Sequence, residues 1–174
     1  YYWPNNATVS VIGAFDRNEV LSLVAERFGA ISESPESIPD VLTREPRQRG
    51  QRRVVVRQAG QLGALMIAFK SPPALEADTD ALDVLSVVLA SGKSSRLFRR
   101  LTDAGLTSSV SASASRLRNP GLFYLFASLA PDHTHEEVET VIFDAIKEIQ
   151  TEGVTEQEVQ GAKNQLKAQE AFGR

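Results

Sequence analysis

The sequence predicts an α+β domain in which helices are layered on one face of a mainly antiparallel sheet. Hairpin signals stand beside pairs of amphipathic helices, instead of alternating with single helices as in a parallel α/β fold. The 174 residues are 42% apolar and 24% charged, which is ordinary for a globular protein that buries a core. The chain has no cysteine, so it offers neither a disulfide framework nor a thiolate metal site.

The first segment with structural signals is a predicted strand followed by a helix. Residues 8–15, TVSVIGAF, alternate and are rich in β-branched side chains, which predicts a strand. Asp16 and Glu19 form a capping-box pattern at the start of a helix, and Gly29 is a stop signal at its end. The predicted apolar face of this helix consists of Val20, Leu23, Val24 and Phe28.

Residues 31–53 separate this strand and helix from the rest of the chain. They contain three prolines and show no periodicity, so we predict a linker or a long surface loop. An arginine cluster begins within them. It lacks interleaved aromatic residues and the chain has a net charge of −3, so we interpret it as a solvated loop and a protected edge strand and predict no nucleic-acid partner. The cluster consists of Arg47, Arg49, Arg52, Arg53 and Arg57.

The remaining elements follow in the order β-β-α-α-β-β-α-α. The predicted strands cover residues 53–58, 62–70, 108–115 and 122–129, the last two joined by a turn at 118–121. The first two predicted helices cover residues 78–90 and 94–103. The last two helices begin with the capping boxes Thr134/Glu137 and Thr155/Glu158.

The ends of the chain indicate a piece of a longer polypeptide. It opens on Tyr1 without a methionine and stops at Arg174 within a helical pattern. The sequence contains no apolar run approaching 18 residues and no signal-peptide pattern, so we predict no membrane span. A signal sequence could have been removed with the missing part, and the compartment therefore stays open.

The stretch SGKSSRLFRRL, residues 91–101, contains the Gly-Lys-Ser end of a phosphate-binding P-loop. A P-loop needs a second glycine five residues earlier and a buried strand before it, but position 87 is Val87 in a segment with helical spacing. We therefore predict no nucleotide site. In the structural interpretation, Gly92 ends one helix and Ser94 caps the next. The core-facing residues of that second helix are Leu97, Phe98 and Leu101.

The residues offer no catalytic or metal site of their own. His133 and His135 are the only histidines, and on an opening helix positions two apart diverge. No third imidazole or thiolate completes a zinc site, so we interpret the pair as part of the helix start. A serine triad has no G-x-S-x-G elbow to support it. We predict no catalytic residue and no metal ligand in this chain.

Four stretches, in consistent order from about residue 1 to 172, resemble the insulinase (M16, pitrilysin-like) zinc peptidase family, and specifically its inactive or C-terminal domain. They are YYWPNNATVSVIGAFD, ALDVLSVVLASGKSSRLFRRLTDAGL, NPGLFYLFASLAP and EGVTEQEVQGAKNQL. The resemblance implies the fold of that family, the LuxS/mitochondrial-processing-peptidase-like metallohydrolase fold. It also implies paired α+β domains that close as a clamshell around a peptide.

The resemblance places zinc outside this chain. Family members hold the metal in one half only, on an inverted H-x-x-E-H helix and a downstream glutamate. That motif is absent here, so zinc is expected in the parent protein or a partner subunit. By resemblance, residues 1–30 are the last strand and helix of the metal-bearing domain, residues 31–53 the linker, and residues 54–174 most of the inactive domain, truncated at its end.

The resemblance also assigns a position to the 91–101 stretch, which matches the family's GGG-x-SSRLF segment on the wall of the non-catalytic half. The implied substrate-cleft wall consists of Gly92, Ser94, Ser95, Arg96, Thr102 and Ser108. Some members grip substrate with an arginine and a tyrosine that follow the segment. The matching places here are Thr102 and Ser108, one residue closer together than in the family pattern, so that pair is absent.

The sequence and its family resemblance are compatible with two functions. The first is the non-catalytic half of a bacterial zinc metalloendopeptidase, paired with a catalytic M16 domain and enclosing a peptide substrate. The alternative is a non-enzymatic scaffold related to such peptidases. For residues 1–30 we expect docking on the second domain or exchange between two copies as a homodimer. A bacterial periplasmic or cytoplasmic location is compatible with either function.

Overall fold

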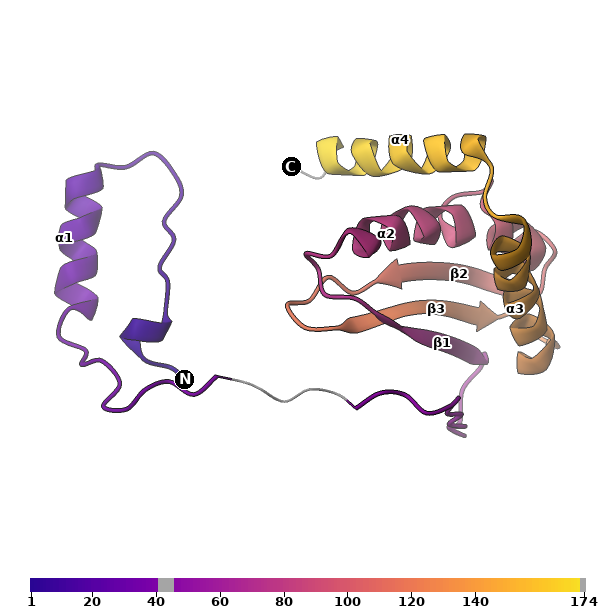
Figure 1. Cartoon of the computed structure of the whole chain (residues 1–174), viewed down its shortest axis with the longest axis horizontal. Helices are drawn as coiled ribbons and strands as arrows, with labels where there is room; N and C mark the ends of the chain where they lie inside the picture. The colour runs from indigo at the N-terminus through magenta and orange to yellow at the C-terminus, as the bar shows by residue number, and fades with distance from the viewer. Residues whose placement is uncertain (41–45, 173–174) are drawn as a thin grey trace. The chain divides into compact units, whose positions relative to one another are not determined.

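The computed structural model describes residues 1–40 and 46–172, and the chain divides into two compact units, Tyr1–Val55 and Val56–Arg174 (Figure 1). Residues 41–45 of the predicted linker lie outside the described residues. The described remainder of the linker has no regular secondary structure, in agreement with the absence of periodicity in its sequence.

The first unit contains a short 3-10 helix, η1 (Pro4–Asn6), and one α-helix, α1 (Arg17–Phe28). The Asp16 side chain accepts hydrogen bonds from the N–H groups of Asn18 and Glu19 at 2.8 and 2.9 Å, as an N-cap should. The strand predicted at 8–15 is wrong, because the structure assigns no strand to these residues and pairs them with no described strand. A strand is stable only when a neighbour satisfies its backbone groups.

The second unit is built on a three-stranded antiparallel sheet with the order β1-β3-β2. The strands are β1 (Ala64–Ser71), β2 (Thr107–Ala114) and β3 (Gly121–Leu129). In the register, Leu125 of the central strand lies opposite Ile67 on one side and Ala112 on the other. Residues directly opposite share a face, so these three apolar side chains belong to one side of the sheet.

The strand predicted at 53–58 is also wrong. The structure assigns no strand there, and the side chains of Val54, Val55 and Val56 are 85%, 70% and 74% exposed. Their β-branched side chains favour an extended backbone, but intrinsic strand preference is weak without packing against a neighbour. The first strand of the sheet therefore begins at Ala64.

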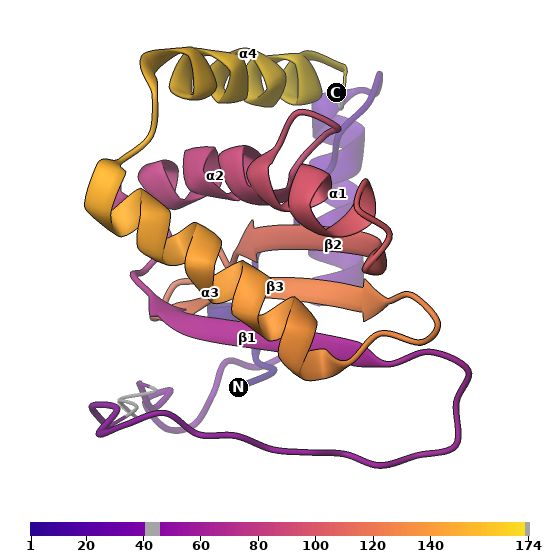
Figure 2. The same cartoon turned by 90° about the vertical axis from the view of Figure 1, so that its right-hand side faces the viewer.

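Helices cover the sheet on one face, as predicted, and α4 packs on α2 in a further layer (Figure 2). The helices are α2 (Ala77–Ala90), α3 (His135–Glu152) and α4 (Glu156–Phe172). Alternate residues of β3 are buried beneath α2 and α3, namely Phe123, Leu125, Ala127 and Leu129. Among the described residues, no helix has the length and apolar character needed to cross a bilayer.

Between α2 and β2 the chain forms η2 (Phe98–Thr102), a π-helical turn where an α-helix was predicted over 94–103. The widened turn is visible in its hydrogen bonds, since the Asp103 N–H donates to the Phe98 carbonyl at 2.9 Å and the Leu106 N–H to the Leu101 carbonyl at 2.8 Å. Leu97 and Leu101 are fully buried, as predicted, whereas Phe98, the third residue predicted to face the core, is only half-buried.

Candidate functional site

The candidate site begins at the turn that ends α2. Gly92 has a backbone φ of +81°, which residues with a Cβ rarely adopt, and this explains why a glycine stands there. The hydroxyl of Ser95 donates to the Gly92 carbonyl at 2.8 Å, and the Ser95 carbonyl accepts from the Arg99 N–H at 3.2 Å. The predicted cap at Ser94 is therefore wrong by one residue, because Ser95 makes the contacts that begin the next helical segment.

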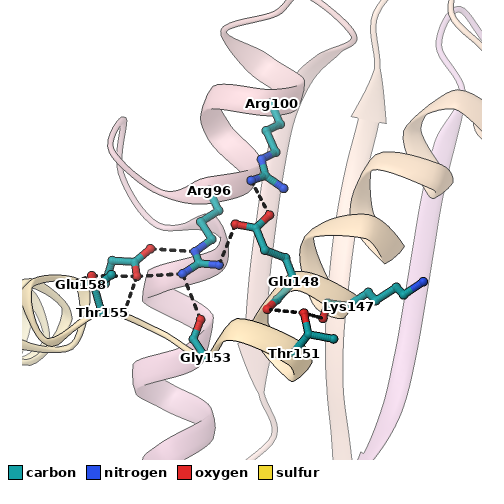
Figure 3. A network of polar contacts seen from close by, with 8 residues as sticks. All are labelled: Arg96, Arg100, Lys147, Glu148, Thr151, Gly153, Thr155 and Glu158. Carbon is teal, nitrogen blue, oxygen red and sulfur yellow. Dashed lines mark hydrogen bonds and ion pairs between the residues drawn. The ribbon is translucent and has the colours of Figure 1, made fainter.

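Arg96 joins this turn to the connection between α3 and α4 (Figure 3). Its Nε and Nη2 atoms donate to the two carboxylate oxygens of Glu158 at 2.7 and 2.8 Å. Its Nη1 donates to Glu148 at 3.2 Å and its Nη2 to the carbonyl of Gly153 at 3.2 Å. A two-pronged guanidinium–carboxylate pair is directional as well as strong, so Arg96 fixes the position of the turn relative to both helices.

Glu148 is shared by two arginines. It accepts from Arg96 and, through its other oxygen, from Nη2 of Arg100 at 2.6 Å. The Arg96 side chain is 10% exposed, while those of Glu148 and Arg100 are 31% and 40% exposed. The network thus runs from a nearly buried guanidinium to a solvent-accessible one, along the side of η2 that faces the C-terminal end of α3 (Figure 3).

Glu158 has two roles in the same place. Its carboxylate accepts from the N–H and hydroxyl of Thr155 at 2.8 and 2.9 Å, and its own N–H donates to the Thr155 hydroxyl, which completes the predicted capping box. The Arg96 hydrogen bonds, followed by those of Thr155, lower the pKa of Glu158 from 4.5 to about 2, although partial burial opposes the shift. Glu158 is therefore ionised at neutral pH.

A groove of about 940 Å³ lies between α2, the turn at residues 91–100 and the N-terminal half of α4. Its apolar lining includes Val87, Val88 and Ala162, which form the small core between α2 and α4. Ser94, Ser95 and Arg96 line it too, so the structure brings half of the predicted wall residues to one concave surface. Gln165 Nε2 of α4 donates a hydrogen bond of 2.7 Å to the hydroxyl of Ser91, in the turn beside Gly92.

Thr102 and Ser108 are not part of the groove lining. The hydroxyl of Thr102 lies 3.1 Å from that of the buried Thr107, at the opposite end of η2 from Ser95. Ser108 is the extra residue of a β-bulge at the start of β2, and its hydroxyl donates to the Ser128 carbonyl at 3.3 Å. Of the six predicted residues, Ser94, Ser95 and Arg96 line the groove, Gly92 lies in the adjacent turn, and Thr102 and Ser108 lie elsewhere. Their membership of a substrate-cleft wall stays a prediction.

The carboxylates that hold Arg96 were missed by reasoning from the sequence. Glu158 was recognised only as a cap, and Glu148 was not singled out. They lie 62 and 52 residues from Arg96, a separation at which no spacing rule applies. Only the packing of α3 and α4 against the turn reveals them.

The donor groups of the described residues do not suit zinc. No set of three or more histidine, aspartate or glutamate side chains gathers there in a way that could hold a metal. His133 Nδ1 lies 3.6 Å from Glu137, within the capping box of α3, while the ring of His135 lies beside Gly63, just before β1.

Comparison with known families gives a match over nearly the whole chain. The model of the peptidase M16 inactive domain matches residues 1–166. Zinc protease PqqE of Helicobacter pylori is 30% identical over 171 residues, covering 97% of this chain and 38% of that protein. An uncharacterized zinc protease of Mycobacterium leprae is 26% identical and has the same coverage of its own length. The chain thus spans well under half of these curated relatives.

Solved structures agree with this match. A crystal structure of a protease from Helicobacter pylori superposes with a TM-score of 0.87 at 29% identity, covering 99% of this chain and 42% of that one. The peptidase M16 inactive domain from Pseudomonas fluorescens superposes with a TM-score of 0.56 at 22% identity over 62% of this chain and 26% of that one, and it supports the fold alone. The family resemblance in the sequence and the predicted fold are both confirmed.

Proposed function

Because the chain belongs to the peptidase M16 inactive-domain family, we propose that it forms the non-catalytic half of an M16-type zinc metallopeptidase. In this proposal the chain builds part of the chamber wall that encloses and orients a peptide, while the zinc chemistry belongs to a catalytic M16 domain in the same polypeptide or in a partner subunit. The observation that carries the proposal is the match to the inactive domain over residues 1–166.

The geometry supports a role in shaping the substrate chamber rather than in catalysing the reaction. The groove is concave, its position is fixed by the Arg96 network, and its lining combines apolar side chains with hydroxyl and amide groups. Such surfaces orient a peptide by complementarity. The hydroxyls of Thr102 and Ser108 are short and bonded within the chain, so neither side chain is arranged to reach across a cleft.

The test is to combine this chain with the M16 domain that carries H-x-x-E-H in the same protein or operon partner. Hydrolysis of a fluorogenic peptide is measured for each half alone and for the mixture, with zinc content measured on each half. We expect the zinc on the catalytic half only, and at least about a hundredfold gain in kcat/KM on mixing, since orientation supplies a large share of catalysis.

Two outcomes would contradict the proposal. A catalytic half that is fully active alone and unaffected by the chain would exclude a chamber-wall role. Loss of H-x-x-E-H from the accompanying M16 domain, together with stable association, would favour the scaffold alternative.

A further inference from the structure

The groove between α2 and α4 contains one uncompensated charge. Five charged side chains line it, three arginines and two glutamates. Arg96 and Arg100 are held by Glu148 and Glu158, as described above. Arg99 is exposed and forms no ion pair with any residue that the structure describes. The lining therefore offers one free guanidinium.

The rest of the lining suits a chain with both apolar and polar groups. Val87, Val88 and Ala162 are at most 7% exposed and form an apolar floor. The exposed Ser94 stands beside them, and its hydroxyl has no hydrogen-bond partner among the described residues. At about 940 Å³ the groove lies in the size range of ligand sites and can hold several residues of an extended peptide.

We propose that this groove binds an extended peptide segment bearing a carboxylate, which pairs with Arg99 while a neighbouring apolar side chain rests on the floor. A guanidinium presents parallel N–H groups that match a carboxylate, and the Ser94 hydroxyl is a further donor on the same surface. The proposal rests on the proposed function for the presence of a peptide. It deepens that function by naming an acidic residue as the recognised feature.

Charge favours a peptide carboxylate over a polyanion. A phosphate backbone is usually met by several clustered cations, whereas this groove has one free guanidinium beside two neutralised carboxylates. The chain as a whole carries a net charge of −3, which repels an extended polyanion. An apolar floor next to one free guanidinium fits a peptide that carries a single carboxylate beside an apolar side chain.

Fluorescence anisotropy with the 174-residue chain tests the proposal directly. The probe is a labelled peptide of alanine, valine and serine, blocked at both ends, with one central glutamate, and its matched control has glutamine instead. We expect the glutamate peptide to bind about fivefold to tenfold more tightly, and the difference to shrink as salt is raised. A glutamine peptide with a free C-terminal carboxylate shows whether a terminal carboxylate serves as well.

Two variants locate the effect. Arg99→Gln should remove the preference for glutamate and leave the affinity for the glutamine peptide unchanged. Arg118→Gln is the matched control, because Arg118 is equally an exposed arginine but lies in the β2–β3 turn, outside the groove lining. It should keep the full preference. Circular dichroism of both variants confirms that the fold is intact.

Several results would overturn the proposal: equal affinities for the two blocked peptides, no binding of either at millimolar concentration, or a preference that survives Arg99→Gln. A dimer that dissociates in Arg99→Gln, with peptide binding unchanged, would make a second copy the occupant instead. Failure of the hydrolysis test on mixing the two halves leaves this binding result standing, so the groove and the chamber-wall function can fail separately.

Discussion

The two units of the chain carry similar local signals but differ in burial. In the second unit the side chains of Leu97, Leu101 and Leu125 are fully buried, the sheet shares one core with α2 and α3, and α4 adds a smaller core against α2. In the first unit no described residue is buried, and Leu21, Leu23 and Phe28 of α1 are 53%, 49% and 50% exposed. A capped helix can thus be specified locally, whereas a strand and a core require neighbours.

The largest expected difference between the units is the cost of a core truncation. Leu125→Ala removes a fully buried side chain from the central strand and should lower the free energy of unfolding by about 4 kcal/mol. Leu23→Ala makes the same chemical change at a half-exposed helix position and should alter it by less than about 0.5 kcal/mol. Urea unfolding followed by circular dichroism compares them. Similar losses for both would mean that the first unit has a core after all.

The sequence predicted best those elements that are specified by residues close together in the chain. The Thr134/Glu137 and Thr155/Glu158 capping boxes form as expected, and four of the five predicted helices, α1 to α4, begin or end within about two residues of their predicted positions. The two failed strands had β-branched residues but lacked a partner. The π-turn η2 and the carboxylates around Arg96 depend on packing between distant segments, which no local pattern encodes.

Arg96 provides a second comparison, between a nearly buried ion pair and an exposed one. Arg96→Ala leaves Glu158 and Glu148 without their shared partner and should cost about 3 kcal/mol of unfolding free energy. Arg116→Ala is the control, since Arg116 also bridges two carboxylates, Asp80 and Asp83, but its side chain is 48% exposed. We expect a loss of at most about 1 kcal/mol there. Equal losses would show that burial does not set the strength of the Arg96 network.

The pH dependence of the unfolding free energy is a further test of the ion pair between Arg96 and Glu158. The pKa of Glu158 is lowered to about 2 in the folded chain from 4.5, so its contribution is complete above about pH 5 and is lost as the pH falls toward 2. The full contribution is about 3 kcal/mol at most. In Glu158→Gln the decline of unfolding free energy between pH 5 and 2 should be shallower by this amount. An unchanged slope would mean that the Arg96 pair does not persist in solution.

The exposed apolar surface of the first unit should be covered in solution, by the second unit or by another copy. Hydrogen exchange of residues 8–28, measured together with light scattering over a range of concentrations, checks this expectation. Slow exchange in a monomer indicates docking within the chain, and protection that grows with a dimer indicates exchange between copies. A monomer in which residues 8–28 exchange rapidly would contradict both.

The smallest expected effect concerns Thr102 and Ser108, at the positions where the family resemblance implies an arginine and a tyrosine. Their hydroxyls contact Thr107 and the Ser128 carbonyl, so each is already engaged in holding the turn and the bulge at the start of β2. In the peptidase of the proposed function, Thr102→Ala and Ser108→Ala should each change kcat/KM by no more than about 1 kcal/mol of transition-state free energy.

We expect a small effect because the Thr102 and Ser108 side chains are short. An arginine can donate paired hydrogen bonds to a peptide and a tyrosine hydroxyl can stabilise an oxyanion, but a threonine or serine hydroxyl on the same backbone ends several bonds short of either. Any loss in these variants should therefore follow the unfolding free energy, since it arises from the local turn. A roughly hundredfold loss of kcat/KM with unchanged stability would show that this half takes part in catalysis. It would also show that its short hydroxyls act where longer side chains do in other members.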